Sequence, residues 1–94
     1  MAENSDRTAR EVTVRGMVQG VGFRYHCVDQ AHRLGVAGWV RNEPDGTVAA
    51  VFEGTPEAVD AMVDWCRRGP AFGQVDDVDT RPVAPSGART FSVR

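Results

Sequence analysis

The chain has 94 residues, enough for one small domain with a modest hydrophobic core, and its formal net charge is −2. All eleven basic residues are arginine, which excludes a Schiff-base lysine, a lysine general base and a phosphate-binding P-loop, whose motif requires lysine. A charge so close to neutral also argues against a general affinity for nucleic acid.

The N-terminal residues 1–9 have no apolar core, so they predict a short disordered tail rather than a signal peptide. Residues 10–94 are expected to form the domain. No stretch approaches the ~18 apolar residues of a membrane span, so we expect a cytoplasmic protein that does not enter membranes. A disulfide between Cys27 and Cys66 is arithmetically allowed, but cysteines on apolar helix faces are more often reduced core residues.

The chain opens with a predicted strand and a predicted helix. Residues 11–18 alternate apolar and polar side chains, as a half-buried strand does. Residues 23–34 place their apolar side chains at helical spacing, and Gly35 is expected to end the helix in the left-handed conformation.

A hairpin is predicted next. Residues 36–42 and 47–53 have the character of strands, and the turn sequence Glu43-Pro44-Asp45-Gly46 lies between them. This pairing would place Asn42 at the mouth of the hairpin.

A second helix is predicted from the residues around Pro56. Thr55 is a suitable N-cap, Pro56 suits the first helical position, and Glu57 complements the positive end of the helix dipole. Apolar residues then recur at helical spacing until Gly69, which is expected to end this helix together with Pro70.

Two further strands are predicted, at residues 74–83 and 90–94. Val75 and Val78 are three positions apart and break strict alternation, which a β-bulge would explain. The order β-α-β-β-α-β with one added strand predicts an α+β fold, a ferredoxin-like two-layer α/β sandwich with a mostly antiparallel sheet and two helices on one face.

A glycine-rich segment joins the first strand to the first helix and has the pattern of an anion site. Glycines let backbone N–H groups turn toward one point, and the first turn of a helix leaves N–H groups without internal partners. Arg24, at the helix start, adds a planar fork of donors suited to phosphate. The expected phosphate-binding amides are those of Gln19, Gly20, Val21, Gly22 and Phe23.

Asn42 has two interpretations. Asparagine is common just before a hairpin turn, so the residue is explained by turn propensity alone. If the hairpin mouth lies beside the glycine-rich segment, its neutral amide is instead suited to orienting a water molecule.

Other polar residues are weaker candidates. His26 lies about 200° around the helix from Arg24 and His32 lies two turns further on, so both are expected to be solvated. Asp76, Asp77 and Asp79 lack the spacing and glycine of a calcium loop, so we expect a solvated strand face and no metal site.

The segments at 16–24, GMVQGVGFR, and 38–46, GWVRNEPDG, together closely resemble the two signatures of the acylphosphatases. The resemblance spans about residues 11–94. It implies the sandwich described above and the hydrolysis of carboxyl phosphates to a carboxylate and inorganic phosphate. It also implies that no metal, cofactor or covalent intermediate takes part.

The resemblance also assigns roles to residues. Arg24 matches the family's substrate-binding arginine, Asn42 its water-positioning asparagine and residues 16–23 its phosphate cradle. Met17 departs from the pattern, because relatives often carry a basic or small polar residue there. A cradle that contacts only the phosphate group does not determine which acyl group the substrate carries.

The expected partner is a small-molecule acyl phosphate, and the protein is expected to be a monomer that binds neither nucleic acid nor membranes. The alternative function is a non-catalytic phosphate-binding or ligand-binding regulatory module of the same fold, because fold alone does not fix function. A nucleic-acid-binding sandwich would need a basic sheet face with exposed aromatic residues.

Overall fold

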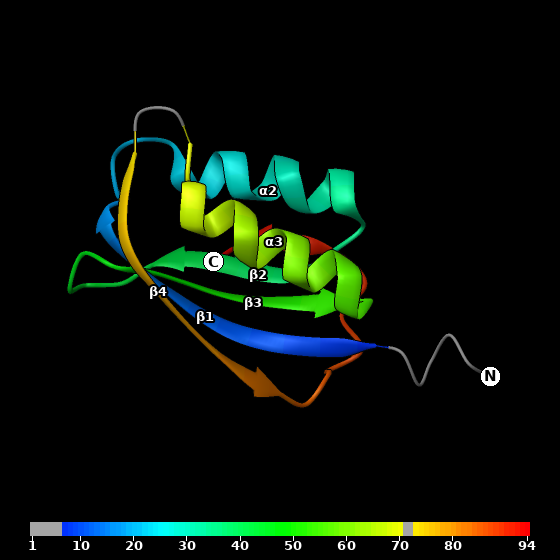
Figure 1. Ribbon diagram of the computed structural model, residues 1–94. Helices are drawn as coiled ribbons and strands as arrows, with labels where there is room; N and C mark the ends of the chain where they lie inside the picture. The colour runs from blue at the N-terminus through cyan, green and yellow to red at the C-terminus, as the bar shows by residue number, and fades with distance from the viewer. Residues whose placement is uncertain (1–6, 71–72) are drawn as a thin grey trace.

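The computed structural model describes residues 7–70 and 73–94, which form a five-stranded sheet with two helices packed on one face (Figure 1). The elements are β1 (Thr8–Met17), α2 (Phe23–Leu34), β2 (Ala37–Asn42), β3 (Val48–Gly54), α3 (Pro56–Arg68), β4 (Gln74–Val83) and β5 (Phe91–Val93). The strand order is β4-β1-β3-β2-β5. This arrangement confirms the predicted ferredoxin-like α+β sandwich with an added C-terminal strand.

The strand ends differ from the prediction at several points. β1 begins at Thr8, three residues before the predicted start, because Thr8 and Ala9 pair with Gly54 and Glu53 of β3. These two residues therefore belong to the sheet and not to the predicted tail at 1–9. Residues 1–6 of that tail lie outside the described residues. β5 is shorter than the predicted strand at 90–94.

Both helices end at the glycine predicted to end them, and α3 also begins at its predicted cap. Gly35 ends α2 with a φ of 71°, the left-handed conformation that glycine adopts without a steric penalty. The Thr55 hydroxyl accepts a hydrogen bond of 3.2 Å from the Ala58 N–H, and Pro56 occupies the first turn of α3. By contrast, α2 begins at Gly22 without a side-chain cap.

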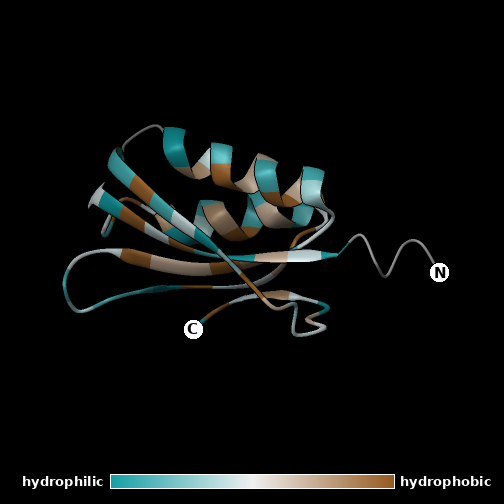
Figure 2. Ribbon diagram, turned by 60° about the horizontal axis from the view of Figure 1, so that its bottom comes forward, coloured by the Kyte–Doolittle hydropathy of each residue, from teal (hydrophilic) through white to brown (hydrophobic). Residues whose placement is uncertain are grey.

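A continuous apolar core joins the helices to the sheet. In Figure 2 the hydrophobic bands of the helices lie toward the sheet. The core includes Val12, Val14, Phe23, Cys27, Ala31, Val40, Val48, Ala50, Phe52, Val59, Met62, Cys66 and Phe91. Both cysteines are buried and unpaired, which confirms that they are core thiols, and burial raises the pKa of Cys27 to about 12.

The predicted bulge lies in β4. Arg15 of β1 pairs with Asp77 but Gly16 pairs with Val75, so Asp76 is the extra residue. This insertion explains why Val75 and Val78 depart from alternation. Gly16 is required at this point, because a Cβ there would lie 2.2 Å from the Gln74 carbonyl oxygen.

The three aspartates of β4 lie on an exposed strand face, as predicted. Asp77 and Asp79 both form ion pairs with Arg15 across the β1–β4 ladder. Within residues 7–70 and 73–94, no group of three acidic, histidine or cysteine side chains is placed to hold a metal ion.

Glu53, at the end of β3, anchors the segment that leads from β4 to β5. Its carboxylate is 1% exposed and accepts hydrogen bonds from Ser86 N (3.0 Å), Ser86 Oγ (3.1 Å), Gly87 N (2.8 Å) and Arg7 Nη2 (3.0 Å). Burial by itself raises the pKa of Glu53, but the hydrogen bonds from Ser86, Arg7 and Gly87 outweigh it and lower the pKa to about 2. The ionised carboxylate therefore holds the segment between β4 and β5 against the end of β3.

We predict that the Glu53→Gln variant loses stability at neutral pH. The folded-state pKa lies below the unfolded value, so the contribution of Glu53 is present above about pH 4.5 and is lost as the pH falls toward 2. A shift of this size corresponds to about 3 kcal/mol. Urea unfolding should show a wild-type advantage of this order at pH 7 that shrinks toward zero near pH 2.

The Asp64→Asn variant is the matched control, because Asp64 is exposed beyond the first turn of α3 and has no ion pair among the described residues, and its unfolding free energy should follow the wild type across the same pH range. Parallel stability curves for the wild type and Glu53→Gln would contradict the anchoring role of Glu53.

Candidate active site

Sheet topology brings the ends of β1 and β2 to the same edge of the molecule. Both strands pair antiparallel with β3, and Val14 of β1 and Asn42 of β2 both pair with Val48, one on each side. The loop that follows β1, residues 18–22, therefore leaves the sheet beside the hairpin mouth. This is the proximity on which the second interpretation of Asn42 depends.

The Gln19 side chain fastens this loop to the hairpin. Its Nε2 donates hydrogen bonds to the carbonyl oxygens of Glu43 (2.8 Å) and Thr47 (2.9 Å), which flank the turn. Gln19 was predicted only as a backbone ligand. Sequence reasoning missed its side-chain role, because the two carbonyl partners lie 24 and 28 residues away.

The turn to which Gln19 is bound is itself held by local hydrogen bonds. Asp45 Oδ1 accepts hydrogen bonds from the Thr47 hydroxyl (2.7 Å) and the Thr47 N–H (3.0 Å), which lower the pKa of Asp45. Glu43 N donates to Thr47 O at 2.9 Å. These hydrogen bonds order the turn to which the Gln19 side chain attaches the loop.

The loop backbone has the conformation of an anion-binding turn. Gly20 and Gly22 both have a φ of 78°, in the left-handed region that other residues rarely adopt. Gly22 is also the N-cap of α2, and the first turn of the helix carries neither a capping side chain nor an acidic residue. The first amides of α2 are therefore available to an anion.

A cavity of about 270 Å³ lies at this loop, and we call it the loop cavity. Its walls are formed by Val18, Gly20, Gly22, Phe23, Arg24, Tyr25, Asn42 and Val93. Arg24 and Asn42, 18 positions apart in the sequence, thus face the same small volume. Of the five residues predicted to bind phosphate through their amides, Gly20, Gly22 and Phe23 line the cavity, whereas Gln19 and Val21 do not.

The guanidinium of Arg24 is available for a ligand. Arg24 is half-buried, and none of the carboxylates in the described part of the chain forms an ion pair with it. Arg33, further along the same helix, is by contrast ion-paired with Asp29. An unpaired arginine facing a cavity beside free helix amides is a suitable partner for a phosphoryl group.

Neither histidine enters the loop cavity. His26 and His32 are exposed, as predicted, and line a neighbouring cavity instead. The walls of the loop cavity include no aspartate, glutamate or histidine from the described residues. The cavity therefore offers positive charge and hydrogen-bond donors without a carboxylate or imidazole base.

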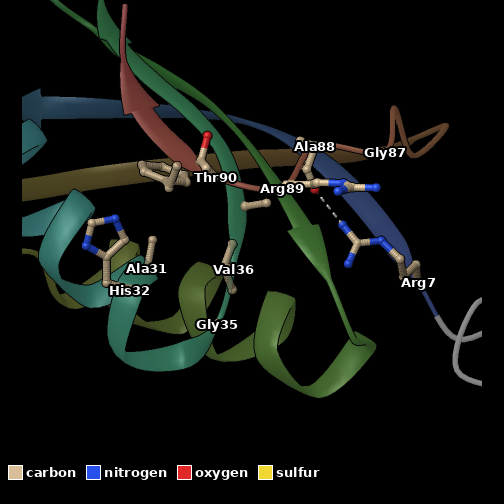
Figure 3. A pocket seen from close by; sticks show the side chains of 11 residues that line it. Arg7, Ala31, His32, Gly35, Val36, Gly87, Ala88, Arg89 and Thr90 are labelled. Atoms are coloured by element: carbon tan, nitrogen blue, oxygen red, sulfur yellow. Dashed lines mark hydrogen bonds between the residues drawn. The ribbon is translucent and has the colours of Figure 1, made fainter.

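A larger cavity, of about 690 Å³, lies at the other end of α2 (Figure 3). Arg7, His32, Arg89 and Thr90 are among the residues around it. Arg7 is already engaged there, because its Nη2 donates to Glu53 Oε2 and to the Ala88 carbonyl. Arg89 in this cavity has no ion pair among the described residues either, so neither volume nor a free guanidinium alone identifies the site. The loop cavity is favoured because its arginine lies beside the free N-terminal amides of α2, whereas the larger cavity lies at the C-terminal end of that helix, where the dipole is negative.

In the described part of the chain, neither helix has the length and apolar character needed to cross a membrane.

Comparisons with known proteins identify the family of the chain. The model of the Acylphosphatase family matches residues 10–93. An acylphosphatase from Nocardioides sp. is 59% identical over 88 residues, which cover 94% of this chain and 89% of the relative.

Two solved structures have the same fold over nearly their whole length. An acylphosphatase from Coxiella burnetii is 32% identical with a TM-score of 0.94, covering 98% of this chain and 97% of that one. The Bacillus subtilis acylphosphatase is 34% identical with a TM-score of 0.89, covering 93% and 98%. The chain thus belongs to the acylphosphatase family, and it is an enzyme that hydrolyses acyl phosphates.

Proposed function

We propose that the loop cavity binds the phosphoryl group of the acyl phosphate, and that Arg24 and Asn42 divide the catalytic work. The observation that carries this proposal is that one cavity of about 270 Å³ is lined by Gly20, Gly22, Arg24 and Asn42. The Arg24 guanidinium and the loop amides bind the phosphoryl oxygens, and the Asn42 carboxamide holds the attacking water.

The reaction is a displacement at phosphorus. The oxygen of the water attacks phosphorus, the bond from phosphorus to the acyl oxygen breaks, and the carboxylate departs with the bonding electrons. Because a carboxylate is a stable anion, the leaving group needs no general acid. Phosphoryl transfer of this kind depends on positioning and on stabilising charge on the equatorial oxygens.

The proton of the attacking water goes to an oxygen of the phosphate. This assignment is supported by the walls of the loop cavity, which hold no aspartate, glutamate or histidine among the described residues. A protonated arginine cannot accept a proton, and an asparagine amide does not change charge near neutral pH. The positive charge supplied by the protein lets the reaction proceed without a metal ion.

The rival function, a non-catalytic phosphate-binding module, has no observation in its favour. Its fold would be the same, but the family membership established above belongs to enzymes.

We expect Arg24→Lys to lower kcat/KM for acetyl phosphate by at least about 10²-fold, because an ammonium group cannot reproduce the two parallel hydrogen bonds of a guanidinium. The assay is run with a chelator present. Arg33→Lys is the matched control, an exposed arginine on the same helix, and it should retain wild-type rates. An Arg24→Lys enzyme as active as this control would contradict the role given to Arg24.

Asn42→Ala should lower kcat by about 10²-fold, comparable to the loss of one preorganised hydrogen-bonding group, while the inhibition constant for inorganic phosphate changes less than about twofold. Gln74→Ala serves as the control, since the Gln74 amide is exposed on β4 and bonded to Asp76. If phosphate binding weakens as much as turnover, Asn42 is a phosphate ligand and does not position the water.

We also propose that the protein is a cytoplasmic monomer. Its two cysteines are buried and unpaired, as is usual in a reducing compartment. In the described residues the large exposed apolar side chains are Met17, Tyr25 and Val93. Sedimentation equilibrium should give a single species near the chain mass of 10.2 kDa, and a mass twice as large would contradict the monomer.

A further inference from the structure

The loop cavity, of about 270 Å³, lies just below the volumes of pockets that bury drug-sized ligands, roughly 300–1,000 Å³. With the phosphoryl group held by Arg24 and the loop amides, as proposed above, a small acyl group such as acetyl stays within the cavity, whereas a bulky one reaches its mouth.

A second cavity adjoins this mouth. It has a volume of about 510 Å³ and lies between α2 and β5, with Tyr25, His26, Val28, Asp29, His32 and Val93 on its walls. We call it the α2–β5 cavity. Tyr25 and Val93 are the two residues that line both cavities, so an acyl group leaving the loop cavity on this side meets them first.

Tyr25 and Val93 are unusually exposed for their types. Tyr25 is 82% exposed and Val93 is 49% exposed, and Met17 is the other large apolar residue of this kind in the described chain. Tyr25 follows Arg24 directly on α2, and Val93 pairs with Val40, two residues before Asn42. Two of these three apolar side chains therefore stand beside the catalytic pair.

The α2–β5 cavity has three polar wall residues among those described, His26, Asp29 and His32, but the two that it shares with the loop cavity, Tyr25 and Val93, offer apolar surface. Its one acidic wall residue among those described, Asp29, is ion-paired with Arg33 through an Nε–Oδ2 distance of 3.2 Å. The remaining contact surface near the mouth is the tyrosine ring and the valine side chain. An acyl group with an aromatic ring or a branched apolar chain would remove both from water.

We propose that Tyr25 and Val93 form a binding site for the acyl group of the substrate and give the enzyme a preference for bulky apolar acyl phosphates. The proposal rests on the proposed phosphoryl site and extends it to the other half of the substrate. Because the acyl group is bound alike in the ground state and the transition state, the contact acts chiefly on KM.

The test compares benzoyl phosphate with acetyl phosphate in the wild type, Tyr25→Ser and Val93→Ser. We expect Tyr25→Ser to lower kcat/KM for benzoyl phosphate by about tenfold, mainly through KM, and to leave acetyl phosphate within about twofold. Val93→Ser should act in the same direction. Val83→Ser is the matched control, because Val83 is a half-buried valine at the end of β4 and lines neither cavity, and it should change neither substrate.

The outcomes separate this proposal from the phosphoryl site. If both Ser variants change the two substrates equally, or change neither, the acyl-binding site is wrong while the phosphoryl site stands. An Arg24→Lys enzyme that keeps wild-type rates on both substrates would overturn the phosphoryl site, and the acyl-binding site with it. Circular dichroism of each variant establishes that a loss of rate is not a loss of fold.

Discussion

The two hydrogen bonds from the Gln19 carboxamide to the carbonyl oxygens of Glu43 and Thr47 are the contacts on which the active site depends. Antiparallel pairing of β1 and β2 with β3 brings the loop and the hairpin to one edge of the sheet, but pairing alone leaves a five-residue loop free to move. The Gln19 amide joins the two. Its two hydrogen bonds therefore fix the position of the loop amides relative to Asn42.

The start of α2 lacks the side-chain cap that would stabilise the helix. A capping side chain at the start of α2 would stabilise the helix by about 1 kcal/mol, but its oxygen would occupy amides that a phosphoryl oxygen needs. Gly22 stands at that position, and α3, which has no such task, is capped by Thr55. The uncapped helix and the unpaired Arg24 are thus the same feature, hydrogen-bond donors left without partners at the place where we propose that the phosphoryl group binds.

Local features of the sequence were sufficient to predict most of the architecture. Gly35 and Thr55 mark helix boundaries through their own backbone and side chain, and the hairpin follows from a turn of four residues. Long-range partners were not predictable in this way. The burial of Glu53 depends on Ser86 and Gly87, which lie 33 and 34 residues away, and no residue close to Glu53 in the sequence indicates these partners. Arg24 and Asn42 were identified by motif and resemblance, and their convergence on one cavity required the fold.

Titration of ¹⁵N-labelled protein with inorganic phosphate, followed by NMR of the backbone and side-chain amides, shows directly whether phosphate binds in the loop cavity. We expect the amides of Gly20, Gly22 and Phe23, the Arg24 side chain and the Asn42 carboxamide all to shift along one binding curve. Shifts confined to the cavity around Arg7 and Arg89, with the loop unchanged, would contradict the proposed site.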